Sequence, residues 1–144
     1  MFPRILLILS LLFSVNVYAE QSKTFGNYKV HYSAFTADML TKEIAKAYKI
    51  KRSHSTVLIN ITLMKETGEP LPIAHKAKVE IKGRNLVGQN KSISVREILE
   101  QDAVYYIGEV SVSNQETVQF DVTVRPLNTK KKFNFSFKEK FYNQ

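Results

Sequence analysis

The chain contains no cysteine and no tryptophan among its 144 residues. The lack of cysteine excludes a disulfide scaffold, a lipoprotein anchored through a cysteine, and any enzyme or zinc site that uses a thiolate. Packing and backbone pairing must therefore supply the stability of the fold. The hydrophobic fraction of 44% and the charged fraction of 24% are typical of a globular protein and exclude a disordered chain.

Long apolar segments are rare as well, and the longest one stands at the N-terminus. Arg4 precedes the largely apolar stretch Ile5–Val15, and Val17-Tyr18-Ala19 follows it. This order is typical of a secretory signal peptide. A helix of about eleven residues is too short to cross a hydrocarbon core of about 30 Å.

We therefore expect cleavage between Ala19 and Glu20. Residues 1–19 would form the signal peptide, and residues 20–144 would form a single domain. The mature protein would be periplasmic or secreted, and it would not span the membrane.

Alternation of apolar and polar residues dominates the mature chain, which predicts half-buried antiparallel strands. The alternating runs are 28–32, 57–63, 79–81, 93–95, 118–124 and 133–137, and a further strand is expected within 104–112. One segment differs, because Leu40, Ile44 and Tyr48 are spaced by four and Thr41 can cap a helix. We expect a mainly β protein, an immunoglobulin-like antiparallel β-sandwich of about seven strands with one short docked helix at about 41–48.

The segment Leu99–Ile107 resembles the tyrosine corner of immunoglobulin-like domains. In that motif a tyrosine hydroxyl bonds back to a turn and fixes a connection that crosses between sheets. Leu99, Asp102 and Tyr105 match its positions. We also expect a bulge at Gly108-Glu109, because Tyr105 and Ile107 are odd-numbered whereas Val110 and Val112 are even-numbered.

No catalytic arrangement is recognisable, so we expect a protein that is not an enzyme and that has no catalytic residues and no cofactor. The three histidines are far apart in the chain, and no motif for a metal or a nucleophile is present. A copper site of histidine and methionine side chains is one alternative. Its candidates are His31, His54, His75, Met39 and Met64.

The formal net charge of +8 favours an anionic partner. Basic residues gather in the segments 46–52, 76–84 and 130–140. Because an exported protein meets little nucleic acid, we expect no nucleic-acid partner. The partner would be an unidentified envelope protein or an anionic envelope surface, such as the membrane or lipopolysaccharide. The candidate interaction residues, chosen near strand ends and loops, are His31, Arg52, Arg84, Asn85 and Tyr106.

Several stretches of the chain resemble a family of exported bacterial proteins catalogued as domain of unknown function 4426. They include 23–35, 43–48, 84–89, 102–107 and 140–142. The resemblance implies a small protein of the Gram-negative envelope and supplies no activity or site residue. The sequence thus predicts a non-catalytic binding or accessory module of the cell envelope. The alternatives are a basic module on an anionic membrane or lipopolysaccharide surface, and a periplasmic copper-binding sandwich.

Overall fold

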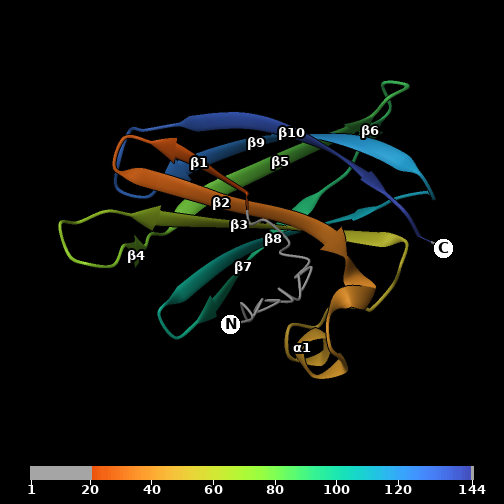
Figure 1. The fold of residues 1–144 in the computed structure, drawn as a ribbon, viewed down its shortest axis with the longest axis horizontal. Helices are drawn as coiled ribbons and strands as arrows, with labels where there is room; N and C mark the ends of the chain where they lie inside the picture. The colour runs from red at the N-terminus through yellow and green to blue at the C-terminus, as the bar shows by residue number, and fades with distance from the viewer. Residues whose placement is uncertain (1–20, 144) are drawn as a thin grey trace, which may run out of the picture.

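The computed structural model describes residues 21–143 (Figure 1). The expected signal peptide and its cleavage site at Ala19 and Glu20 lie outside these residues. Within the described part of the chain, no helix is both long and apolar enough to cross a membrane.

Two antiparallel sheets form a sandwich, which confirms the predicted fold class. Sheet A has the order β1 (Gln21–Phe25), β2 (Tyr28–Thr36), β3 (Thr56–Lys65), β8 (Ala103–Ser111) and β7 (Ser94–Glu100), and β4 (Ile73–Ala74) pairs with β3. Sheet B has the order β10 (Phe133–Phe141), β9 (Glu116–Pro126), β5 (Ala77–Asn85) and β6 (Asn90–Lys91). The described residues form ten strands rather than about seven, because two of them are two-residue strands and β1 was not expected.

The main core lies between the two sheets. Val57, Ile59, Ile61 and Leu63 alternate along β3 and are 0–1% exposed. They face Val118, Phe120, Val122 and Val124 of β9 in the same core cluster. The odd-numbered phenylalanines of β10 pack along the side of this core, where the Phe133 ring stacks on Phe25 at 4.6 Å between centroids. The period-two pattern therefore identified the core residues correctly.

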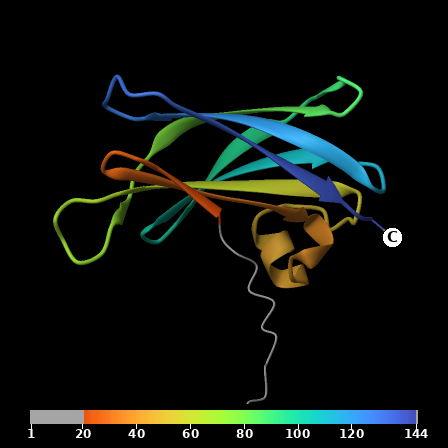
Figure 2. The same cartoon turned by 45° about the horizontal axis from the view of Figure 1, so that its top comes forward.

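A second, smaller apolar cluster lies on the opposite face of sheet A. It is covered by the segment between β2 and β3, which contains the 3-10 turn η1 (Ala37–Met39) and the helix α1 (Lys42–Ala47) (Figure 2). The expected helix is thus confirmed, and the Thr41 hydroxyl caps it by accepting a hydrogen bond from the Ile44 N–H at 3.2 Å. Leu58 and Ile107 of sheet A are buried against this segment.

The predicted bulge at Gly108-Glu109 is wrong. The ladder between β3 and β8 runs without interruption from Thr56↔Ser111 to Ile61↔Tyr106. Even-numbered residues of β8 face the main core, whereas Tyr105 and Ile107 face the α1 segment. The odd-numbered and the even-numbered residues of β8 are both apolar because sheet A is covered on both faces, so no change of register is needed.

The predicted tyrosine corner is also wrong. Leu99 and Asp102 belong to a tight hairpin in which β7 and β8 pair within one sheet, so the connection does not cross the sandwich. Leu99 is an exposed residue of the edge strand. The neighbouring Tyr106 makes the inter-sheet link instead: its hydroxyl accepts from the Ala77 N–H of sheet B at 2.8 Å and donates to Glu97 at 2.9 Å.

We predict that Tyr106→Phe destabilises the fold by about 1–3 kcal/mol, because it leaves the buried Ala77 N–H without its partner. Tyr105→Phe is the matched control, since the Tyr105 hydroxyl makes no hydrogen bond with another described residue. Urea unfolding of both variants measures the difference. An equal loss for the two variants would contradict the assignment of the link to Tyr106.

Candidate functional site

The face of sheet A that carries α1 contains an apolar cleft, which we call the α1 cleft. Its volume is about 210 Å³. Ten residues line it: Phe35, Leu40, Ile44, Tyr48, Ile50, Leu58, Asn60, Ile98, Tyr105 and Ile107. The cleft exists because the short α1 segment covers only part of the apolar strip on this face. A concave, mostly apolar site with few polar groups is the usual form of a small-molecule site.

Three residues with polar groups line the cleft: Tyr48, Tyr105 and Asn60. Asn60 is the one without an aromatic ring. It stands on β3 between Ser33 of β2 and Ile107 of β8. Its side-chain oxygen is buried and has no hydrogen-bond partner among residues 21–143. Such a group costs free energy in the folded state, and unsatisfied groups of this kind tend to be retained where they serve a function.

Hydrogen bonds hold the helix α1 at its C-terminal end and the turn that precedes it. At its C-terminal end the Tyr48 hydroxyl donates a hydrogen bond to the Glu100 carboxylate at the end of β7, and this bond raises the pKa of Tyr48. At the preceding turn the Arg52 guanidinium donates to the carbonyl oxygens of Leu40 and Asp38, at 2.8 and 3.0 Å. Arg52, a predicted interaction residue, thus holds the segment that covers the cleft.

A second hollow, the His31 hollow, adjoins the first across Tyr105. Its lining residues are His31, Thr62, Met64, Ala74, Asp102, Ala103, Val104 and Tyr105, around about 280 Å³. His31 and Met64, two of the five copper candidates, therefore line the same hollow, and Asp102 lines it as well.

The other copper candidates lie elsewhere. The ring of His75 contacts Tyr28, a residue of the main core, and its Nδ1 lies 2.8 Å from the Lys76 carbonyl oxygen. His54 stands in the exposed turn before β3, and Met39 is an exposed residue of η1. Among the described residues, no group of three or more histidine, cysteine or acidic side chains could hold a metal ion.

Tyr106 is not an exposed interaction residue, as the sequence suggested, because it is 4% exposed and links the two sheets. Burial and the nearby Glu97 carboxylate raise the pKa of Tyr106 to about 12. The motif spacing pointed to Tyr105, whereas the tyrosine that links the sheets is Tyr106.

Two of the three basic clusters converge on one surface. The outward-facing residues of β5, β9 and β10 include six cations and two anions: Lys78, Lys82, Arg84, Arg125, Lys138 and Lys140 against Glu80 and Asp121. We call this surface the basic face of sheet B. Arg84 lines a hollow of about 270 Å³ on it together with Gln119 and Lys138. The third cluster, which includes Lys46, lies on α1 and so on the far side of the sandwich.

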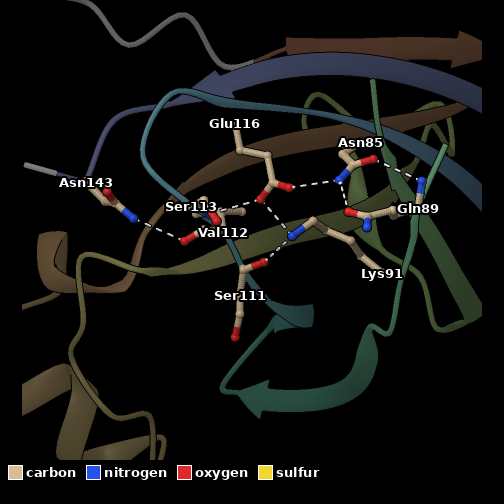
Figure 3. A network of polar contacts seen from close by, with 8 residues as sticks. All are labelled: Asn85, Gln89, Lys91, Ser111, Val112, Ser113, Glu116 and Asn143. Carbon is tan, nitrogen blue, oxygen red and sulfur yellow. Dashed lines mark hydrogen bonds and ion pairs between the residues drawn. The ribbon is translucent and has the colours of Figure 1, made fainter. Parts of the chain in front are cut away.

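Asn85, the last predicted interaction residue, belongs to a polar network around Glu116 (Figure 3). Its amide donates to Glu116 at 3.2 Å and to Gln89 at 2.8 Å. Lys91 forms an ion pair with the same Glu116 carboxylate at 2.7 Å, and both side chains are less than one-fifth exposed. The network joins the β5–β6 loop to the start of β9, so Asn85 stabilises the conformation of this loop.

Burial alone would raise the pKa of Glu116, but bonds from Lys91, the Ser113 N–H and Asn85 hold that pKa below its ordinary value. The ionised carboxylate therefore stabilises the fold above its ordinary pKa, and this contribution is lost as the pH falls through the lowered pKa.

We predict that Glu116→Gln costs about 1–3 kcal/mol at pH 7, because hydrogen bonds to a charged group are replaced by weaker ones. The difference from the unchanged protein should shrink at an acidic pH below the lowered pKa of Glu116, where the carboxyl group itself is protonated. Denaturant unfolding at both pH values measures it. Glu80→Gln, which alters two exposed ion pairs, is the control with little effect. A loss of equal size at both pH values would contradict the prediction.

Sequence reasoning missed the α1 cleft and Asn60. The signal was present, since Asn60 is a polar amide within the apolar run of β3. Its significance depends on its neighbours across the sheet, however, and these appear only with the strand register.

Comparison with known proteins places the chain among solved folds. No curated protein is significantly similar to it in sequence. A DUF4426 family protein from Pseudomonas aeruginosa is similar in structure, with a TM-score of 0.74, 26% identity, and coverage of 87% of this chain and 96% of that one. FetP of uropathogenic Escherichia coli, expressed recombinantly in the periplasm, shares the fold with a TM-score of 0.57 and 9% identity over 87% and 95% of the two chains.

A copper-bound variant of the same FetP gives a TM-score of 0.58 at 10% identity over 88% and 97% of the chains, which shows a common fold only. The family model described as a domain of unknown function, DUF4426, matches residues 22–144. The sandwich with its α1 segment, the likeness to a solved member and this match over nearly the whole domain agree: the chain belongs to the DUF4426 family.

Proposed function

We propose that the protein is a non-catalytic binding module of the cell envelope and that the α1 cleft is its binding site. The observation that carries this proposal is the buried, unpartnered oxygen of Asn60 in a cleft that is otherwise apolar or aromatic. Apart from the phenols of Tyr48 and Tyr105, the lining has no group that could act as a nucleophile or general base. The leader-like N-terminus and the fold shared with FetP support the envelope location.

The size and chemistry of the cleft define the ligand class. A dry apolar cavity of about 150 Å³ is enough to hold a benzene ring. The α1 cleft is somewhat larger, at about 210 Å³, and its acceptor requires a donor. The proposed ligand is therefore a small apolar molecule, such as an aromatic ring, that carries one N–H or O–H group. The Tyr48–Glu100 bond, which ties the helix to the edge strand, favours a small molecule over the broad surface of a partner protein.

We predict that indole binds more tightly than 1-methylindole, which has a similar shape but no donor. Asn60→Leu should abolish this preference and should also stabilise the free protein by about 1 kcal/mol, because it removes an unsatisfied buried group. Ligand titration followed by NMR, together with urea unfolding, measures both effects.

Thr62→Val is the matched control, since Thr62 is the next outward-facing residue of β3 and lines the neighbouring hollow. It should leave the preference for indole intact. Equal affinities for the two ligands in the unchanged protein would contradict the proposal, as would a large loss of stability in Asn60→Leu.

A second candidate function is copper binding in the His31 hollow. The observation that favours it is the presence of His31, Met64 and Asp102 around one hollow. Imidazole and thioether groups are ligands that copper prefers, and the carboxylate adds negative charge. The fold shared with a copper-bound FetP variant agrees with this candidate. The donors present fit a site of one histidine and one methionine, with His54 and His75 excluded by their positions.

For this candidate we predict that the purified protein binds one copper ion and that His31→Ala or Met64→Leu weakens binding at least tenfold. His54→Ala, on an exposed turn, is the control and should bind as the unchanged protein does. Competition with a chromogenic copper chelator measures the affinity. Binding that survives in His31→Ala would rule out this site.

A further inference from the structure

One end of sheet B combines exposed apolar side chains with positive charge. We call this end the basic rim and define it by Arg84, Leu86, Val87, Lys138, Lys140 and Tyr142. Leu86 and Val87, at the tip of the β5–β6 loop, are 73% and 80% exposed. Leu86 lines the same hollow as Arg84 and Lys138, so the loop tip borders the basic face directly.

The C-terminal end of β10 completes the basic rim. Lys140 lies over the ring of Tyr142, with its Nζ 5.5 Å from the ring centroid, and Tyr142 is exposed. Figures 1 and 2 both place the β5–β6 loop and the end of β10 at the same end of the molecule. The register agrees, because Asn85 pairs with Val118 and Val118 pairs with Glu139.

The loop that presents Leu86 and Val87 is held in one shape. The Asn85 N–H donates to the Gln89 carbonyl oxygen, and the Gly88 N–H donates to the Asn85 carbonyl oxygen, both at 3.1 Å. Gly88 has φ +82, which a residue with a side chain rarely adopts. In the Glu116 network (Figure 3), a hydrogen bond to Glu116 holds the Asn85 side chain in place. The two apolar side chains are thus fixed outward rather than free to fold back onto the core.

The positive charge of the basic rim is available to a partner. Lys78 and Arg125, at the other end of the basic face, are engaged by Glu80. Arg84, Lys138 and Lys140 form no ion pair with another residue of the range 21–143. A cationic surface next to protruding apolar residues is complementary to the interface of an anionic bilayer.

We propose that the basic rim docks the protein on a bilayer of anionic phospholipid. Leu86 and Val87 enter the boundary between headgroups and acyl chains, and Tyr142 lies at the level of the headgroups, where tyrosine is favoured. Arg84, Lys138 and Lys140 contact the lipid phosphates. A soluble polyanion would contact only the cationic side chains, whereas a bilayer can also bury Leu86 and Val87.

The test is cosedimentation of the purified protein with vesicles of equal parts phosphatidylglycerol and phosphatidylcholine, compared with phosphatidylcholine alone. Binding should require phosphatidylglycerol and should fall steeply between low and high salt. The double variant Leu86→Ser, Val87→Ser should bind at least tenfold more weakly. Leu71→Ser is the matched control, because Leu71 is 77% exposed in the β3–β4 loop at the opposite end of the molecule.

A second pair of variants tests the charge. Lys138→Gln with Lys140→Gln should weaken binding about fivefold or more and should make the salt dependence shallower. Lys42→Gln with Lys46→Gln removes the same charge from α1, on the far side, and should have little effect. Because all variants share the same N-terminal residues, these comparisons isolate the basic rim.

Three outcomes would overturn the proposal. They are the absence of binding to phosphatidylglycerol vesicles, binding to lipopolysaccharide micelles but not to the vesicles, and unchanged binding of the Leu86→Ser, Val87→Ser variant. The last outcome would mean that the charged side chains bind the vesicles without help from Leu86 and Val87. All substituted side chains are exposed, and an unchanged melting temperature confirms that each variant is folded.

Discussion

The fold depends on one strand that buries apolar side chains on both faces. Along β3, Ile59 and Ile61 are buried against sheet B, whereas Leu58 is buried on the opposite face. A strand of this kind needs two covers, because either face left in water would forgo the free energy of burial. Sheet B covers the first face completely, but the α1 segment covers only part of the second. The α1 cleft is the part that remains open, and so the candidate site follows directly from the packing of the central strand.

The same constraint explains what the sequence could predict. Alternation identified the main strands, and spacing by four with a threonine cap identified α1, because both patterns depend on neighbours close in the chain. The error came from assuming one apolar face for β8. Under that assumption Tyr105 and Ile107 required a bulge, whereas a sheet with two covered faces accommodates both parities in one regular strand.

The sites were harder to predict because they depend on partners distant in sequence. The register places Asn60 between Ser33 and Ile107, and neither of them bonds its side-chain oxygen. The basic face forms because β9 stands between β5 and β10 and brings their outward-facing cations together. Neither fact follows from composition or local periodicity. Asn85 was noticed correctly near a loop, but its role became visible only through its bonds to Glu116 and Gln89.

The two proposed sites lie on opposite sides of the sandwich, and this arrangement has a physical consequence. The α1 cleft opens on the outer face of sheet A, whereas the basic rim belongs to sheet B. A protein docked through Leu86 and Val87 would therefore contact the bilayer with residues that do not line the α1 cleft. Net charge alone cannot orient a protein on a membrane, but six cations against two anions on one face, next to an apolar tip, can.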